Sequence, residues 1–600
     1  PMRESSVPSD RFYDDLDLKF DFLKQDSVQS NFFYYNLSAN SPQSIQSDIY
    51  SGRIKPIKSG KDKYQQIRDY LAKVVREHQA VNEFDQFVSY TGHGSYSNSL
   101  TAWRSEMETV KEQFPFIAEK GGQAKFLRYS FQDYMKEQIL SQLRRDDLDF
   151  MVFHEHGLPE RQYLSEIPTA MSFEDGIVSM QKSARSLARR RLSKPEEAKK
   201  FIEERAEKYG ISQSWFDGYD DPKKIESDSI EDLNLYIELD DVTKIAPNAR
   251  FVIFDACYNG DFREDDYIAG RYIFADGKTV ATLGNSVNVL QDKSANDLLG
   301  LLGMGMRAGK WAQLTNILES HITGDPTFRF TPDDRVVKYQ NLFGGDISNS
   351  EWIKVLKTSP YADIQALALE ELHRQAYPEL GTVLYDTYKS SPFYVVRYRC
   401  LDLLEQLDHP NFREVLKLGV KDPYEFVRRI SIHRMGKVGL DEFLPLMVEA
   451  YGTDWNSERV VFNVEMALMT YDVDKIKTAI EQSSLTPELK EKLLNKTQNS
   501  YYGKIDNEIL KNEDKPARRI QSIKALKNIN RHEAIEDYLK IVEDKTEPED
   551  VRIAMLETLA WYRVSYRKPL IEKVCRGLID DSSQSASLRT EALRTLNCLY

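Results

Sequence analysis

The second half of the sequence repeats a helical frame, and this repeat constrains the fold more than any other feature. In this frame an apolar residue is followed by three residues of any type, a small residue, three more residues of any type and a second apolar residue. Its clearest copies are IQALALEEL (364–372), VRYRCLDLL (396–404) and VRRISIHRM (427–435). Later copies are LRTEALRTL (588–596), a looser VRIAMLETL (551–559) and a weaker RRIQSIKAL (518–526). A period of about thirty residues is typical of a helical solenoid, in which each unit buries its apolar side chains against its neighbours.

A proline stands just before several copies and Val-Arg opens the inner helix, which resembles the pattern of HEAT repeats. Cys400 occupies the small position of one copy, and Cys575 and Cys598 also lie in repeat helices. We expect all three thiols to serve core packing. The pattern predicts an all-α, HEAT-like solenoid over residues 346–600, with a long surface suited to a protein partner.

The first half alternates short apolar strands with helical stretches. Strands are expected at FDQFVSY (84–90), AKFLRYS (124–130), DFMVFHE (149–155), RFVIFDA (250–256) and KTVATLG (278–284), and helices at 98–113, 131–145 and 291–308. Strands of nearly continuous apolar character are typical of a sheet buried on both faces. The alternation predicts a three-layer α/β/α domain with a mostly parallel sheet, whose working residues lie at the carboxyl ends of the strands.

The length of 600 residues also predicts more than one domain. We place an N-terminal segment that leads into the α/β domain at 1–59, the α/β domain at 60–345 with a polar helical insertion at about 160–245, and the solenoid at 346–600. The net charge of −14 argues against nucleic acid as a partner of the whole surface, and no apolar run approaches a membrane span. The chain opens PMRESSVPSD, without a leading Met or signal-peptide core, so we expect that upstream residues have been removed.

Cys257 is the candidate nucleophile. It follows the predicted strand RFVIFDA, precedes the turn signal Tyr258-Asn259-Gly260, and is the only cysteine before residue 400. A thiol at this position lies at the carboxyl edge of the sheet, at the mouth of a cleft. Such a thiol needs a general base to form the thiolate at neutral pH.

Two His-Gly turns offer that base, one at His93 and one at His156, and each follows a strand. The strand before His156 is the one just before the Cys257 strand, so neighbouring parallel strands would bring these two side chains together. His93 is the alternative base. His154, on the same strand face as His156, is a further alternative, a group that supports the catalytic pair, or a group that faces the substrate. The main-chain N–H groups of Gly157 and Cys257 are the candidate oxyanion hole.

These residues resemble those of the gingipain-type cysteine peptidases, which share the caspase-haemoglobinase fold. The resemblance rests on His-Gly after one strand and FDACYNGDF after the next. Further similar segments follow in the same order, namely VPSDRFYDDLD (7–17), SGRIKPI (51–57), DGKTVATLGNS (276–286) and ITGDPTFRF (322–330). The resemblance covers about residues 7–330. It implies a cysteine endopeptidase in which Cys257 attacks a peptide carbonyl, His156 is the base, and a thioester acyl-enzyme forms.

The resemblance also carries expectations beyond the dyad. It implies an extracytoplasmic location (secreted, periplasmic or cell surface), because the family is typically exported by bacteria. No cofactor is required; calcium is an option at the acids of DRFYDDLD (10–17) and DFREDD (261–266), as in related folds. The partner is a peptide or protein substrate, and the acidic balance of the chain gives a weak preference for Arg or Lys before the scissile bond.

Two other functions stay open at this point. The chain could be a catalytically silent scaffold of peptidase fold, whose solenoid binds a protein partner. His154 and His156 occupy alternate positions and could form a metal pair, but no third His or Cys stands at a ligand-like spacing, so no metal is assigned.

Overall fold

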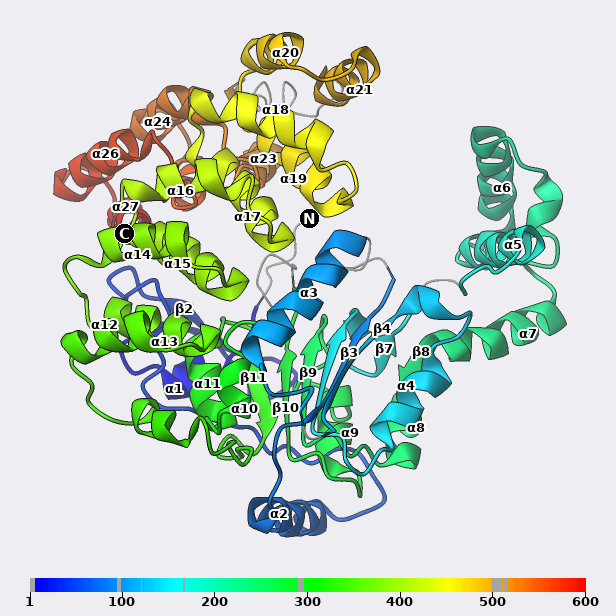
Figure 1. Ribbon diagram of the computed structural model, residues 1–600. Coiled ribbons are helices and arrows are strands. Elements are labelled where there is room, and N and C mark those ends of the chain that lie inside the picture. The colour runs from blue at the N-terminus through cyan, green and yellow to red at the C-terminus, as the bar shows by residue number, and fades with distance from the viewer. Residues whose placement is uncertain are drawn as a thin grey trace.

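The chain folds into an α/β unit followed by a stack of helices, which confirms the predicted fold class (Figure 1). The computed structural model describes residues 6–93, 99–119, 121–165, 168–289, 296–498, 509–510 and 516–600. The α/β unit occupies the first half of the sequence, and the helical stack begins at α12 (Asn349–Thr358). The order of elements therefore follows the change of pattern in the sequence.

A six-stranded sheet forms the centre of the α/β unit, in the order β11-β10-β9-β5-β3-β4. The five predicted strands are β3 (Gln86–Thr91), β4 (Gln123–Arg128), β5 (Phe150–His154), β9 (Phe251–Asp255) and β10 (Ala281–Asn285), and their pairings are all parallel. A sixth strand, β11 (Ser320–Gly324), was not predicted and pairs antiparallel with β10. It is fully buried although it is largely polar, and His321 Nε2 lies 2.7 Å from the main-chain oxygen of Gly260.

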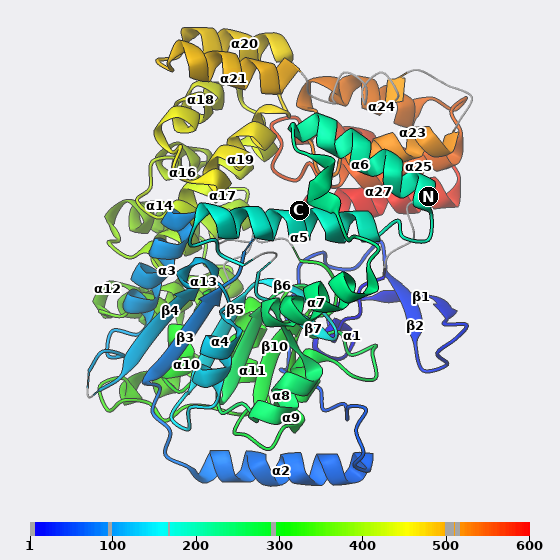
Figure 2. The same cartoon turned by 90° about the vertical axis from the view of Figure 1, so that its right-hand side faces the viewer.

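Helices cover both faces of this sheet because successive strand residues point to opposite sides. One face is covered by α3 (Leu100–Gln113), α10 (Gly300–Gly303) and α11 (Ala308–Thr315), and the other by α4 (Lys136–Leu143), α8 (Leu239–Ile245) and α9 (Ile268–Phe274) (Figure 1 and Figure 2). The single helix expected at 291–308 is wrong over its described part, since α10 ends after one turn. Gly305 follows with a φ of 84°, and α11 starts only at Ala308.

The N-terminal segment extends the sheet edge. Its elements are α1 (Arg11–Asp14) and the hairpin of β1 (Phe20–Gln25) and β2 (Phe33–Leu37), and it is followed by α2 (Lys63–Gln79), the first helix of the α/β unit. Between the hairpin and α2, Arg53 pairs with β11: its N–H donates to Ile322 O at 2.8 Å, and its carbonyl accepts from Gly324 N at 2.8 Å. The segment predicted to lead into the α/β domain is thus joined to the sheet by main-chain hydrogen bonds.

The insertion after β5 is mostly helical, as predicted. A small antiparallel sheet of β6 (His156–Leu158), β7 (Arg161–Tyr163) and β8 (Tyr236–Glu238) forms its base. Between β7 and β8 the chain forms α5 (Phe173–Arg189), α6 (Pro195–Tyr209) and α7 (Pro222–Asp232), which extend away from the large sheet (Figure 1). Because β6 begins two residues after β5 ends, the base of the insertion lies beside the carboxyl edge of the sheet.

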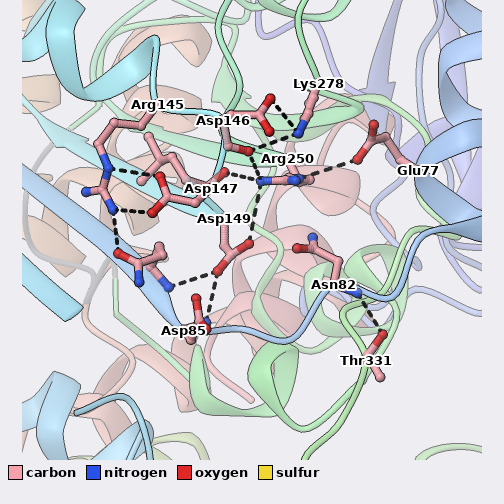
Figure 3. Close-up of polar contacts among 12 residues, drawn as sticks. Glu77, Asn82, Asp85, Arg145, Asp146, Asp147, Asp149, Arg250, Lys278 and Thr331 are labelled. Carbon is pink, nitrogen blue, oxygen red and sulfur yellow. Dashed lines mark hydrogen bonds and ion pairs between the residues drawn. The ribbon is translucent and has the colours of Figure 1, made fainter. Parts of the chain in front are cut away.

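A buried polar cluster fastens the amino ends of β5 and β9 (Figure 3). Asp149, just before β5, accepts the N–H groups of Asp85 and Gln86 at 2.9 and 2.8 Å. Arg250, just before β9, lies 3.7 Å from Asp149 and donates to the carbonyl of Leu148 at 2.8 Å. The two strands are therefore tied together by charged groups at the end opposite to the predicted site.

The helical stack confirms the predicted repeats. The copies of the frame lie in α13 (Ala362–Arg374), α15 (Tyr394–Gln406), α17 (Glu425–Val438), α23 (Pro516–Ala525), α25 (Glu549–Leu559) and α27 (Ala586–Cys598), except that the last residue of the copy at 518–526 lies just beyond α23. The other helices are α12, α14 (Leu380–Ser390), α16 (Asn411–Gly419), α18 (Leu444–Thr453), α19 (Glu458–Leu468), α20 (Val473–Gln482), α21 (Pro487–Gln498), α24 (Ile535–Glu543) and α26 (Lys568–Asp580).

The arginine that follows the first frame position explains part of the repeat. Arg397 donates two hydrogen bonds to buried Asp422, at 2.7 and 2.9 Å, in the turn before the next inner helix. Arg519 makes the same kind of pair with Glu547, at 2.6 and 2.8 Å. Each pair joins one helix to the turn that leads into the next, so a charged residue recurs within an otherwise apolar frame.

The helical stack shares an apolar core with the α/β unit. One continuous cluster contains Val110 of α3, Leu301 of α10 and Leu367 of α13. At the same joint, the Asp363 carboxylate of α13 accepts hydrogen bonds from Gly300 N at 2.6 Å and Gln113 Nε2 at 3.0 Å. The predicted limits of the two domains, 345 and 346, therefore separate two sequence patterns that pack into one core.

The last helix returns to the start of the chain. Asn597 Nδ2 donates to the carbonyl of Ala39 at 2.6 Å, and Cys598 Sγ lies 3.3 Å from Gln43 Oε1. Cys400 and Cys575 are buried in α15 and α26, as expected of core thiols. Cys598 is only half-buried and lies at this contact with the N-terminal segment, so the expectation that it is a core thiol was wrong.

Candidate active site

Strands β5 and β9 are neighbours, as the order of elements predicted, and they place the two candidate catalytic residues. Their register pairs His154 with Asp255 at the carboxyl ends. His156 comes two residues after His154 and is exposed on β6. Cys257 comes two residues after Asp255 and is half-buried. Paired parallel strands thus deliver both residues to the same edge of the sheet.

The segments that carry His156 and Cys257 are in direct contact. A Cβ atom on Gly157 would overlap the main-chain oxygen of Cys257 and lie 2.6 Å from Asn259 Oδ1, so only glycine fits there without a shift. Asn259 Nδ2 in turn donates to the carbonyls of Leu158 at 2.6 Å and Arg161 at 3.1 Å. The Cys257 turn and the β6–β7 hairpin therefore hold each other in place.

The turn after Cys257 is also fixed to β10. Tyr258 adopts a φ of 56°, a left-handed conformation that is uncommon for a residue with a side chain, and its N–H donates to Val287 O at 3.2 Å. Asn285, the last residue of β10, donates to the carbonyls of Phe254 at 3.2 Å and Ala256 at 3.1 Å. These contacts hold the main chain on both sides of Cys257.

The thiol of Cys257 lies against the segment that follows β10. Val289 N–H donates to Cys257 Sγ at 3.4 Å. Burial raises the pKa of the Cys257 thiol above its ordinary value, the Val289 hydrogen bond partly offsets this, and the charge of Asp255 raises it further. The thiol is therefore mainly protonated at neutral pH.

His154 does not face a substrate, and this corrects the expectation that it shares a face with His156. Its side chain is 1% exposed. Nδ1 lies 2.8 Å from Asp255 Oδ2, and Nε2 lies 2.9 Å from Glu106 Oε1. The main chain bends at Glu155 between β5 and β6, so the strand alternation that would align His154 with His156 is broken. Because both ring nitrogens of His154 are engaged, it is also excluded as the alternative base.

His93 lies one strand farther from Cys257 than His156 does. It follows β3, and β5 stands between β3 and β9. Gly92 N–H donates to His154 O at 2.8 Å, and the His93 ring packs edge-on against Tyr129, with centroids 4.9 Å apart. The strand order therefore favours His156 over His93 as the base for Cys257.

The metal sites considered from the sequence find no support in the donor groups. A His154–His156 pair would need a free nitrogen on His154, and carboxylates occupy both. Asp14 and Asp261, from the two acidic segments suggested for calcium, instead bind Arg11 at 2.9 Å and Arg263 at 2.8 Å. Within the described ranges, no group of three or more His, Cys, Asp or Glu side chains is placed to hold a metal ion.

Three residues that shape this site were not singled out in the sequence as parts of it. Glu106 lies within α3, Asn285 ends β10, and Asn259 was noted only as part of a turn signal. All three are buried and polar. Of these three, only Glu106 could have been suspected from the sequence. The polar residues Ser105, Glu106 and Thr109 lie next to the apolar positions of α3, on the side of the helix that is buried.

Comparisons with known proteins add little to this geometry. No family model matches the sequence, and no curated protein matches it. Among solved structures, human deoxyhypusine hydroxylase in complex with glycerol is similar over 42% of this chain and 96% of its own, with 14% sequence identity and a TM-score of 0.17. No helix in the described part of the chain is both long and apolar enough to span a membrane.

Proposed function

We propose that the protein is a cysteine endopeptidase that works through a Cys257–His156 dyad. The observation that carries the proposal is the contact between the two loops: β5 and β9 are neighbours in register, and Gly157 packs on the Cys257 carbonyl. The resemblance of the His-Gly and FDACYNGDF segments to gingipain-type peptidases supports the same assignment. The exposed position of His156 suits a base that must reach both the thiol and the substrate.

The proposed reaction has two steps. His156 takes the thiol proton, Cys257 Sγ bonds to the scissile carbonyl carbon, and the C–N bond breaks as His156 returns the proton to the leaving amine. Water then attacks the thioester carbonyl carbon and His156 takes the water proton; the C–S bond breaks, His156 returns the proton to Cys257 Sγ, and the carboxylic acid product leaves. The N–H groups of Gly157 and Cys257 are the proposed donors to the oxyanion in both steps.

Labelling of Cys257 by an acyloxymethyl-ketone peptide probe tests the proposal, with the site identified by mass spectrometry. We expect rapid labelling in the wild type and its loss in His156→Ala. His93→Ala is the matched control, because it removes the histidine of the other His-Gly turn and should retain labelling. Cys257-dependent cleavage of a mixed peptide pool is the direct assay. Labelling that depends on His93 in place of His156 would overturn the assignment of the base.

One observation favours the second candidate, a catalytically silent scaffold whose solenoid binds a protein partner. Burial raises the pKa of Cys257, whereas an activated nucleophile needs a lowered one. The endopeptidase proposal requires that substrate and His156 supply the deprotonation together. If Cys257 labels no faster than an ordinary exposed thiol, and the wild type cleaves no more of the peptide pool than Cys257→Ala, the scaffold is the better account.

The preference for Arg or Lys before the scissile bond is part of the same proposal, supported by the net charge of −14. A positional-scanning peptide library measures it directly. Faster cleavage after basic residues is expected, and equal cleavage after acidic and basic residues would remove this part of the proposal.

A further inference from the structure

A histidine between two carboxylates lies directly beneath the candidate dyad. The side chains of Glu106, His154 and Asp255 are 0%, 1% and 17% exposed. They come from three different elements, the helix α3 and the strands β5 and β9. The ring of His154 therefore connects one covering helix to two adjacent strands of the sheet.

Both ring nitrogens of His154 act as donors. An ionised carboxylate offers only acceptor atoms, and each nitrogen lies within 2.9 Å of a carboxylate oxygen. Burial alone would lower the pKa of His154, but the charges and hydrogen bonds of Glu106 and Asp255 outweigh it and raise the pKa to about 10. The doubly protonated ring also balances part of the charge of the two acids beside it.

Glu106 is held on several sides, so one end of the Glu106–His154–Asp255 group, called the triad below, is fixed. Ser89 Oγ of β3 donates to its two carboxylate oxygens, at 2.9 and 3.1 Å, and Asn296 Nδ2 lies 3.5 Å from Oε1. Next to Asn296, Asp297 forms an ion pair with Arg399 of α15 at 2.6 Å. The triad therefore connects the strand ends to the helical stack through buried polar contacts.

We propose that His154 is a positioning residue that sets the separation of His156 and Cys257, a role that rests on the proposed function. The His154–Asp255 hydrogen bond crosses from β5 to β9 at the last register pair, and each partner stands two residues before one member of the dyad. The main chains are joined more loosely there, with Glu155 N donating to Asp255 O at 3.4 Å. Without the side-chain bond, the two strand ends can move apart where the dyad needs a fixed distance.

The amino ends of the same two strands provide a matched contrast. Asp149 and Arg250 also form a cross-strand charged pair, 3.7 Å apart, one residue before each strand (Figure 3). This pair stabilises β5 and β9 but lies at the far end from the dyad. A variant there reports the cost of weakening the strand pair without disturbing the position of the dyad.

The first experiment compares His154→Gln with Asp149→Asn in the full chain. Glutamine keeps a polar side chain but cannot donate to both Glu106 and Asp255. We expect His154→Gln to lower kcat and the rate of probe labelling by about a hundredfold with little change in KM, since a displacement of about 1 Å costs that much. Asp149→Asn should lower the melting temperature while labelling stays near the wild-type rate. Equal labelling in the two variants would overturn the proposal.

A second measurement does not depend on catalysis. 1,3-Dibromoacetone alkylates a thiol and then a nearby imidazole, with loss of two bromide ions and two protons, so a Cys257–His156 cross-link reports their separation. Mass spectrometry should find the cross-link in the wild type and Asp149→Asn, and mainly alkylation of Cys257 alone in His154→Gln. Cross-linking without peptide cleavage would reject the endopeptidase and keep the positioning role, whereas full cross-linking in His154→Gln would reject the positioning role.

If His154→Gln does not fold, Asp255→Asn removes one charge and keeps an acceptor for the His154 ring. It should weaken the cross-strand bond and lower the cross-linking yield in the same direction. A folded Asp255→Asn protein that cross-links as well as the wild type would also overturn the proposal.

Discussion

Replacing Asp363 by asparagine should make the stability of the protein less dependent on pH. Asp363 lies on α13 at the joint with the α/β unit, is fully buried, and accepts hydrogen bonds from Gly300 N and Gln113 Nε2. Burial raises the pKa of its carboxyl to about 7, although the two hydrogen bonds and Arg399 act in the opposite direction. The carboxyl is therefore neutral in the folded protein below about pH 7.

The size of the effect follows from this pKa. The ordinary value is 3.8, so folding raises the pKa by about three units, at about 1.36 kcal/mol for each unit. Because the pKa of Asp363 is higher in the folded protein than in the unfolded chain, the stabilising contribution of the neutral carboxyl is fully present below about pH 4. It declines as pH rises and is lost once pH passes about 7. Between about pH 5.5 and pH 8.5 the wild type should lose about 2 kcal/mol at this position, and Asp363→Asn should not.

Urea unfolding at the two pH values, followed by tryptophan fluorescence, measures the difference. Trp311 and Trp352 are buried near the joint, and Trp311 Nε1 donates to Asp297 O at 2.9 Å. Asp363→Leu is the control: it leaves the Gly300 and Gln113 donors without this acceptor, so it should be destabilised at both pH values by about 1–3 kcal/mol for each donor. If wild type and Asp363→Asn lose the same stability between the two pH values, the reasoning is refuted.

Two further changes test the loop contact and the repeat. Gly157→Ala should cost about 1–3 kcal/mol in thermal unfolding and slow probe labelling of Cys257 about a hundredfold, because the added Cβ would overlap the Cys257 carbonyl. If the variant keeps both the stability and the labelling rate of the wild type, the two loops do not touch. Arg397→Met should cost about 3–5 kcal/mol in urea unfolding, because it leaves the buried Asp422 carboxylate without its cationic partner. Lys417→Met is the control: it removes surface pairs with Glu414 and Glu442 and should cost no more than about 1 kcal/mol, and equal losses in the two variants would contradict the role of the repeat arginine.

The sequence predicted those strands and helices that bury apolar side chains. The five parallel strands and the repeat helices follow from apolar spacing, which reports directly which faces are covered. Strand β11 was missed because polar residues such as His321 are buried there with partners that only the fold supplies. The helix expected at 291–308 overlooked Gly303 and Gly305, where the chain turns between α10 and α11.

The site was predictable only as far as strand order reaches. Reasoning from neighbouring strands placed His156 beside Cys257, and the structure makes β5 and β9 neighbours. The environment of His154 could not be predicted, since its partners Glu106 and Asp255 lie 48 and 101 residues away in the sequence. A histidine engaged by two distant acids looks the same in a sequence as one that faces a substrate.

The contact between the last helix and the N-terminal segment has a consequence for synthesis of the protein on the ribosome. Asn597 binds the carbonyl of Ala39 across 558 residues. At about 5–20 residues per second, translation separates these partners by about half a minute to two minutes. During that interval the N-terminal segment lacks its final neighbour, and the α/β unit lacks the helices that complete its core. The nascent chain therefore exposes apolar surface for longer than a chain built from independent domains, and we expect it to depend on chaperones that bind such surface.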